Sequence, residues 1–382
     1  MIPYGKHEVT QSDIDELVGV LKNDPLTQGK QVPLFEDEIR EYVGADFAVA
    51  TSSATAALHL TLLSMGVKKG DFVWTSGISF VASANCALYC GAKIDFVDIN
   101  LNTINLCVDA LTNKLKIAAN NNKIPKVLVV VHMAGQSCDM EKISKICQYY
   151  NVEIVEDASH ATGAKYKEYL VGSCKYSAAT IFSFHPVKII TAGEGGVILT
   201  NRSDIFEKTQ RLRTHGIIKS KEHFEDQSNG EWYYEQIDLG FNYRMSDIHA
   251  TLVRSQLKRL DKYLNAREKI AKKYEKYINW KIYDKTLRQN HNISANHLFV
   301  IRTNPKIGKS NSKIFSELRM AGIGVQKHYI PIYKHPFFKK LSNVTLDLTN
   351  CENYYNNCIS IPIYPTLSEQ KQLYVIETLN NL

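Results

Sequence analysis

The sequence predicts an α/β protein with a mainly parallel, seven-stranded sheet in a large domain and a smaller α+β domain at the C-terminal end. The first observation is a regular alternation of short β-rich runs with amphipathic helical stretches over the first two thirds of the chain. The second is that runs such as "PKVLVVVHMAG" (125–135) are apolar throughout, which is typical of a strand buried on both faces. The third is a change of pattern after about residue 250.

The strands and helices of the large domain follow in the order of successive βαβ units. Strands are predicted over 47–53, 71–77, 93–99, 125–135, 152–160, 178–185 and 195–201. Helices are predicted over 54–67, 80–92 and 140–151. A sheet of this kind binds ligands beyond the carboxyl ends of its strands, so polar residues there are the first candidates for a site.

The smaller domain mixes helices and strands. Its predicted elements are a long helical run over 245–278, a strand over 297–304, a helix over 311–323, strand or loop segments over 325–333 and 358–364, and a final helix over 368–382. We predict a large domain over 1–250 and a small domain over 251–382, with roughly the first 12 residues packing on the small domain.

The composition is that of a globular protein without nucleic-acid or membrane partners. The chain has 382 residues, 44% of them hydrophobic, and a net charge of +7. Its most basic stretch, 255–277, alternates with acids and is typical of a solvated helix face. The N-terminus lacks the pattern of a secretory signal, and no apolar run reaches the length of a membrane span. We therefore expect a cytoplasmic protein.

The eight cysteines show no pair or spacing typical of a zinc site, so no metal is expected. Cys86 and Cys90 lie one helical turn apart in an apolar stretch and are predicted to be buried, reduced thiols.

A first candidate cluster, "TSSATAAL" (51–58), lies where a strand turns into a helix. The first N–H groups of a helix have no partners within it and carry partial positive charge, so this turn is suited to a phosphate. The alternative is an ordinary N-cap formed by a Ser or Thr hydroxyl.

A second candidate is Asp157, at the carboxyl end of the apolar strand "VEIVED". A buried carboxylate needs a cation or several hydrogen-bond donors, and a protonated pyridine nitrogen is one such cation. An N-cap or a buried salt bridge is the alternative. Glu156 points to the opposite face of the strand and is predicted to be structural.

A third candidate is Lys188, which lies among proline, valine and isoleucine in "FSFHPVKIITAGEGG" (182–196). Loss of solvation lowers the pKa of an amine and exposes the lone pair needed to form a Schiff base. A snorkelling surface lysine is the alternative. Ser183 precedes it at a strand end, where its hydroxyl can reach the same phosphate, and the "GEGG" glycines let the backbone pass close to a ligand.

A phosphate cradle, a strand-end carboxylate and a desolvated lysine match the phosphate, ring nitrogen and aldehyde of pyridoxal 5′-phosphate (PLP). "GEGG" is not a dinucleotide fingerprint, because a strand and not a helix follows it. A nucleotide-binding dehydrogenase is disfavoured, because the glycine fingerprint that it requires is missing after the first predicted strand.

The chain resembles the sugar-nucleotide aminotransferases of the DegT/DnrJ/EryC1/StrS family over its whole length. The motifs that carry the resemblance are "TQGKQVPLFEDEI", "SSATAALHL", "GISFVASANCAL", "VHMAGQSCDM", "VEDASHATGA", "SFHPVKIITAGEGG", "LRTHGI" and "LGFNYRMSDIHATL". The resemblance implies the type I fold of PLP enzymes, which is aspartate aminotransferase-like. "LTQG", "HMAGQSCDM", "SFHPVKIIT" and "HYIPIY" resemble most the branch that acts in pseudaminic acid biosynthesis.

The family pattern implies a role for each matched residue. Lys188 would bind the PLP aldehyde and move the proton between donor carbon and cofactor, and Asp157 would pair with the ring nitrogen. Lysine at position 188 argues for transamination, since some relatives with histidine there are dehydratases. Ala54 and Thr55, with Ser183, would hold the phosphate, although many relatives have glycine where Ala54 stands.

Three further positions complete the implied cofactor site. Phe80 would stack on the ring, and His160, at a position often occupied by glutamine, would lie near the ring hydroxyl. Asn242 matches an asparagine that reaches the phosphate from the neighbouring subunit, so the resemblance implies a homodimer with shared active sites.

The implied reaction moves the amino group of L-glutamate, through PLP, to C4 of a UDP-linked 4-keto-6-deoxy-N-acetylhexosamine. Candidates for contact with this substrate are Thr27, Gln28, His215 and His328, each of which has an ordinary loop or cap role as its alternative. One alternative function is a transaminase for a dTDP-linked 4-keto or 3-keto hexose. A non-catalytic regulator with this fold is another.

Overall fold

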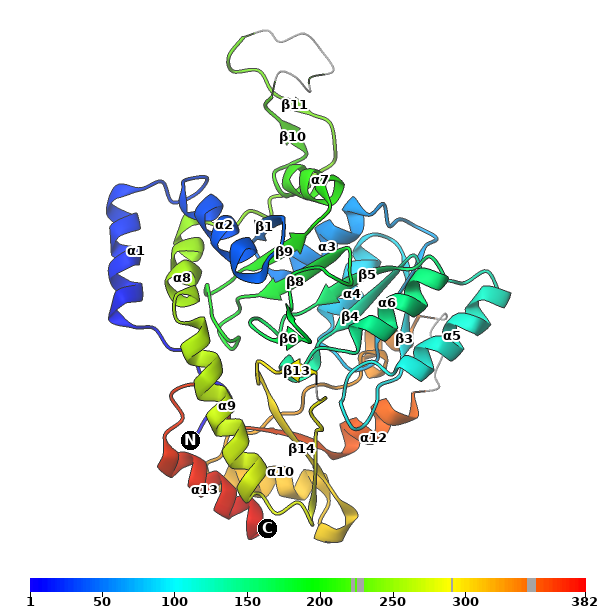
Figure 1. The fold of residues 1–382 in the computed structure, drawn as a ribbon, viewed down its shortest axis with the longest axis vertical. Helices are drawn as coiled ribbons and strands as arrows, with labels where there is room; N and C mark the ends of the chain where they lie inside the picture. The colour runs from blue at the N-terminus through cyan, green and yellow to red at the C-terminus, as the bar shows by residue number, and fades with distance from the viewer. Residues whose placement is uncertain (221–223, 225–229, 290, 342–347) are drawn as a thin grey trace.

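A seven-stranded sheet lies at the centre of the computed structural model, which describes residues 1–220, 224, 230–289, 291–341 and 348–382 (Figure 1). In spatial order its strands are β1 (Phe47–Thr51), β9 (Gly196–Thr200), β8 (Ala179–Ser183), β5 (Glu153–Asp157), β4 (Val127–Val131), β2 (Phe72–Ser76) and β3 (Lys93–Val97). Neighbours are parallel except at β9, which is antiparallel to β1 and β8. The predicted mainly parallel sheet is confirmed.

Helices cover both faces of the sheet (Figure 1). They are α2 (Gln31–Val43), α3 (Ala54–Ser64), α4 (Ala82–Tyr89), α5 (Val108–Asn120), α6 (Met140–Tyr149), α7 (Ser203–Arg213) and α8 (Asp247–Leu257). Side chains of β4 alternate between the two faces: Val127 and Val129 join the core under α3 and α4, whereas Leu128 and Val130 join the core under α5 and α6. This double burial explains the unbroken apolar run in the sequence.

The C-terminal part has an antiparallel sheet of β12 (Tyr283–Lys285), β14 (Phe299–Thr303) and β15 (Cys358–Ile361). Its helices are α9 (Leu260–Tyr277), α10 (Asn311–Met320), α11 (Pro336–Lys339), α12 (Thr349–Asn357) and α13 (Glu369–Asn380). Ile2 belongs to the core of this part and exchanges backbone hydrogen bonds with Gly322 and Gly324. The predicted domain boundary at residue 250 stays a proposal, and it falls within α8, where Ala250 and Val253 both belong to the core that covers β1, β8 and β9.

The remaining elements are short or peripheral. They are α1 (Gln11–Asn23), the strands β6 (Lys165–Tyr166), β7 (Tyr169–Leu170), β10 (Ile217–Ile218), β11 (Glu235–Gln236) and β13 (Asn292–Ile293), and 3-10 turns at Met133–Gly135, Pro305–Ile307 and Ile332–Lys334. The β10–β11 hairpin projects from the body at the top of Figure 1. Across the described ranges, we find no helix with both the length and the apolar character that a bilayer span needs.

The fold confirms one prediction about local structure and corrects another. Cys86 and Cys90 are buried, as predicted. The single helical run predicted over 245–278 is instead two helices, α8 and α9. The break falls at Arg259, whose backbone (φ −113°, ψ 6°) is not helical and whose guanidinium donates to Asp13 at 2.6 Å. This long-range contact between α1 and the break has no signature in the local sequence.

Candidate active site

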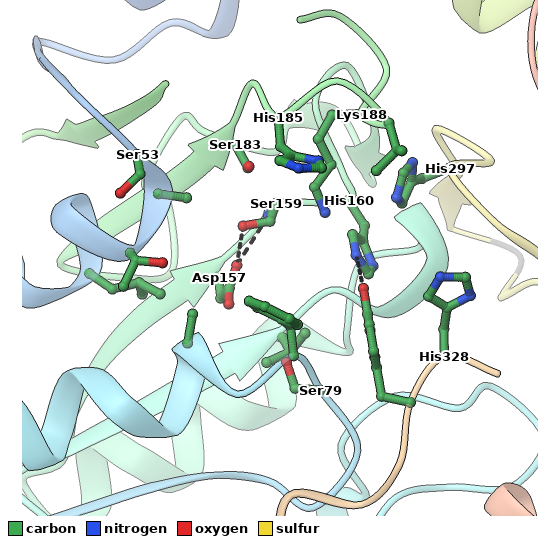
Figure 2. Close-up of a pocket in the computed structure, with 18 of the residues that line it drawn as sticks. Ser53, Ser79, Asp157, Ser159, His160, Ser183, His185, Lys188, His297 and His328 are labelled. Atoms are coloured by element: carbon green, nitrogen blue, oxygen red, sulfur yellow. Dashed lines mark hydrogen bonds between the residues drawn. The ribbon is translucent and has the colours of Figure 1, made fainter. Parts of the chain in front are cut away.

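A cavity of about 360 Å³ lies beyond the carboxyl ends of β5 and β8 (Figure 2). Eight of the predicted site residues line it: Ala54, Thr55, Phe80, Asp157, His160, Ser183, Lys188 and His328. Ser53 and Ser183 lie on one side of the cavity, and His160, His297 and His328 lie on the other, with Asp157 and Lys188 between them (Figure 2). The structure thus brings together residues that are far apart in the sequence.

One end of the cavity is the first turn of α3. Ser53 caps this helix by accepting a hydrogen bond from the Ala56 N–H at 3.1 Å, while Ala54 and Thr55 line the cavity. The N-cap interpretation of the "TSSATAAL" turn is therefore confirmed. An N-cap and an anion-binding helix end are compatible, so the phosphate site stays a prediction. Sequence reasoning did not include Ser53 among the site residues.

Glycine at position 196 allows β9 to pass close to this helix end. A Cβ atom on Gly196 would lie 2.5 Å from the Ala54 nitrogen, a distance that real contacts do not reach. Ser183 is the register partner of Gly196 in the β8–β9 ladder, so both line up beside the first turn of α3. Gly193 has a φ of +82°, which favours glycine in the turn before the strand.

Asp157 is held by hydroxyl and amide donors. Its Oδ1 accepts from the Ser159 hydroxyl at 2.6 Å and from the Ser159 N–H at 3.2 Å, and its Oδ2 accepts from the Ser83 hydroxyl at 2.6 Å. Neither predicted alternative, an N-cap or a salt bridge, describes Asp157 in the part of the chain that the structure covers. The buried carboxylate instead lines the cavity with only neutral partners.

Lys188 has the desolvated amine that its apolar neighbours predict. Burial lowers the pKa of Lys188 to about 8, although the negative charge of Asp157 acts in the opposite direction. No carboxylate of a described residue lies within 4.0 Å of its Nζ, and the amine points into the cavity (Figure 2). The unprotonated, nucleophilic form of this amine is therefore far more populated near neutral pH than that of an exposed lysine.

Uncharged histidines surround the lysine. Burial, with the charge of Lys188, holds the pKa of His160 well below its usual value and lowers that of His328 to about 4. The same causes, together with His160, hold the pKa of His297 well below its usual value. His160 shares a hydrogen bond of 3.0 Å with the Tyr329 hydroxyl, and its ring centroid is 4.4 Å from that of His297.

Two of these imidazoles have unused polar atoms. Nδ1 of His160 and Nδ1 of His297 are buried and have no hydrogen-bond partner among the described residues. A polar ligand in the cavity would fit such orphaned atoms. His297 and Tyr329 were not predicted. His297 is the first residue of the predicted strand 297–304 and Tyr329 lies within the predicted segment 325–333, so neither stands at the carboxyl end of a predicted strand.

Four predicted residues do not line this cavity. Thr27 and Gln28 are exposed in the loop between α1 and α2, which Asp247 anchors through the N–H groups of Gly29 and Gln31. His215 and Asn242 are exposed at the base of the β10–β11 hairpin, where Asn242 pairs with Thr214 in an isolated β-bridge. Their predicted contacts with substrate or a neighbouring subunit stay predictions.

Solved aminotransferases have the same fold over the whole chain. Helicobacter pylori PseC, an aminotransferase involved in the biosynthesis of pseudoaminic acid, superposes with a TM-score of 0.89 at 31% identity, covering 100% of this chain and 98% of its own. The PLP form of the putative sugar aminotransferase Spr1654 from Streptococcus pneumoniae superposes with a TM-score of 0.87 at 26% identity, covering 100% and 98%. The fold and its strand-end cavity define an aminotransferase of the PLP type I class, as predicted.

The family follows from the sequence comparisons. The model of the DegT/DnrJ/EryC1/StrS aminotransferase family matches residues 7–380, and the chain belongs to this family. A relative from Campylobacter jejuni subsp. jejuni serotype O:23/36 (strain 81-176) is 38% identical over 380 residues, covering 99% of this chain and 96% of its own length. That relative is a UDP-4-amino-4,6-dideoxy-N-acetyl-beta-L-altrosamine transaminase.

Proposed function

We propose that this protein is a PLP-dependent transaminase that moves the amino group of L-glutamate to C4 of a UDP-linked 4-keto-6-deoxy-N-acetylhexosamine in pseudaminic acid biosynthesis. The observation that carries the proposal is the convergence of Lys188, Asp157 and the first turn of α3 on one cavity. The full-length relatives of C. jejuni and H. pylori, which bear the name of this transaminase, support the substrate.

Bound PLP would supply an aldehyde that condenses with amines and a ring that accepts electrons from the adjacent carbon. The amine of Lys188, with its lowered pKa, would hold the cofactor and then carry the proton to and from the donor carbon. Asp157 would bind the ring N–H, and the N–H groups of Ala54 and Thr55 with the Ser183 hydroxyl would bind the phosphate.

The other lining residues would orient the cofactor and exclude water. Phe80 would stack on the ring, since its exposed side chain lines the cavity near Tyr329. His160 would bond the ring hydroxyl, and its hydrogen bond to Tyr329 would fix the imidazole in place. This is the role we propose for Tyr329.

A second cavity gives a large acceptor room beyond the cofactor. Its volume is about 650 Å³, and it shares Tyr4, Ser79, Phe80, His328 and Tyr329 with the first cavity. Its outer wall includes the aromatic rings of Phe315 and Tyr355 and the amine of Lys327.

The charge of this outer wall suits a nucleotide diphosphate. Lys327 Nζ donates to the Tyr355 carbonyl at 2.8 Å, and it forms no ion pair with a carboxylate in the described part of the chain. An anionic nucleotide would therefore find an uncompensated cation next to two aromatic rings. These features support a nucleotide-linked sugar as the acceptor.

The test is turnover by purified protein with L-glutamate, PLP and a panel of keto-sugar nucleotides. We expect amination of the UDP-linked N-acetyl substrate and conversion of glutamate to 2-oxoglutarate. Turnover of a dTDP-linked keto hexose without turnover of the UDP-linked substrate would contradict the proposed acceptor. Failure to bind PLP, with no visible absorption change on addition of glutamate, would instead favour a non-catalytic regulator with this fold.

We also propose a homodimer with shared active sites. The projecting hairpin exposes Trp232 at 78%, and its base, where Asn242 also lies, exposes Leu239 at 84%. Side chains of this size are seldom left in water together, and a second copy of the chain would cover them. The cytoplasmic location stays a prediction.

A further inference from the structure

Asp157 ends a short chain of buried hydroxyl groups. The Ser83 hydroxyl lies 2.6 Å from Asp157 Oδ2, and the Ser79 hydroxyl lies 2.7 Å from that of Ser83. Ser83, near the start of α4, is fully buried. Ser79 is also buried but reaches the walls of both cavities.

The acceptor capacity of the carboxylate sets the direction of these hydrogen bonds. An ionised carboxylate only accepts, so the single proton of the Ser83 hydroxyl goes to Asp157. Ser79 must then donate to Ser83. The chain therefore runs from Ser79 through Ser83 to Oδ2, and each bond polarises the next.

The two carboxylate oxygens are not equally occupied. Oδ1 already accepts two hydrogen bonds from Ser159, whereas Oδ2 accepts one from Ser83. A carboxylate offers about four acceptor sites, two on each oxygen. Among the described contacts, the free site is therefore on Oδ2.

We infer that Ser83 is a positioning residue that holds Oδ2 of Asp157 as the acceptor for the ring N–H of the cofactor, with Ser79 polarising it from behind. The inference rests on the proposed function. Ser159 fixes one oxygen and Ser83 the other, so the carboxylate cannot rotate about its Cβ–Cγ bond without losing a charge-assisted hydrogen bond.

The test compares four variants as apoenzymes reconstituted with PLP. Ser83→Ala removes the donor to Oδ2, Ser79→Ala removes only the outer donor, and Ser83→Thr keeps the hydroxyl. Ser144→Ala is the matched control, because that serine donates to the Glu141 carbonyl within α6 and lies outside the site. The readouts are the PLP dissociation constant, the NMR shift of isotope-labelled ring nitrogen, and the thermal unfolding midpoint.

We expect Ser83→Ala to weaken PLP binding about 10-fold to 100-fold, as for loss of a hydrogen bond to a charged group, and to shift the ring nitrogen signal. Ser79→Ala should do both to a smaller degree, and Ser83→Thr should restore both. If Ser83→Thr or Ser83→Ala fails to fold, a shifted ring nitrogen signal in folded Ser79→Ala still supports the chain.

An unchanged dissociation constant and ring nitrogen signal in folded Ser83→Ala or, if that variant does not fold, in Ser79→Ala would overturn the inference while leaving the proposed function intact. Effects equal to those of Ser144→Ala would overturn it as well. Wild-type protein that binds no PLP would overturn both the inference and the proposed function.

Discussion

Glu156 and Asp157 are adjacent carboxylates on β5 with nearly equal exposure, 5% and 6%, but their side chains have different partners. Glu156 points away from the cavity and bonds the His132 imidazole at 2.6 Å and the Ser177 hydroxyl at 2.5 Å. Among the described residues, Asp157 has only hydroxyl and amide donors, and it faces a cavity that Lys188 also lines. A buried carboxylate that has an imidazole partner within the fold is structural, whereas one left with neutral donors at a cavity can bind a cation.

The largest effect is expected on the lysine that shares the cavity with Asp157. Lys188→Ala removes the nucleophile and proton carrier, so single-turnover reaction with glutamate should slow by about 10⁴-fold or more. The thermal unfolding midpoint and some PLP binding should be retained, since Lys188 forms no ion pair with any residue that the structure describes. Turnover near the wild-type rate would remove Lys188 from the mechanism.

The comparison itself is tested by Asp157→Asn and Glu156→Gln. Asp157→Asn should slow both half-reactions by about 10²-fold or more with little change in urea stability, because the electron sink loses its charged partner. Glu156→Gln should lower the free energy of unfolding by about 1–3 kcal/mol and leave the rate per folded molecule unchanged. Equal kinetic effects of the two variants would contradict the division of roles.

Shared active sites are tested by mixing Lys188→Ala with Asn242→Ala, which we expect to lose activity because it would remove a phosphate contact from the neighbouring subunit's site. If Asn242 acts on the partner's site, a mixed dimer has one complete site, and unfolding and refolding the mixture should restore about a quarter of wild-type activity. Each variant alone and a mixture without refolding are the controls. No restoration in a mixture shown to contain mixed dimers would argue that each subunit is complete by itself.

The smallest effect is a shift in the titration of Lys188. Only the unprotonated amine reacts with an acylating reagent, so its modification in the apoenzyme should rise with pH and reach half its maximum near the pKa of about 8. Asp157→Asn removes a charge that raises the pKa of Lys188, so the midpoint should move to lower pH. Mass spectrometry of the Lys188 peptide measures the extent of modification at each pH. An unchanged midpoint in Asp157→Asn would show that the charge of Asp157 does not influence the pKa of Lys188. Glu156→Gln is the control.

The strand pattern predicted the large sheet and the position of the cavity. Asp157, Ser183 and Lys188 could be found because each lies at or just after a strand end, where the parallel arrangement alone brings them together. Tyr329 could not be found in this way. It meets His160 across 169 residues, through packing of the C-terminal part on the large sheet.

The same limit applies to the serine chain and to the helix break. Ser83 has the sequence context of an ordinary polar residue on a short helix, and its contact with Asp157 joins the start of α4 to the end of β5 across 74 residues. Arg259 lies at the break in the helical run and contacts Asp13 of α1, a long-range pairing that no local propensity encodes. Sequence periodicity reports burial along one element, and these features depend on pairs of elements.

The pairing of Ser183 with Gly196 has a thermodynamic consequence for the segment that carries Lys188. Its two ends are joined in the β8–β9 ladder, so residues 184–195 form a loop that is closed by the strands of the fold itself. The entropy of loop closure is then part of the folding free energy and not of the binding free energy. The backbone that carries Lys188 should therefore be ordered in the apoenzyme. Calorimetry of PLP binding should accordingly show little loss of backbone entropy.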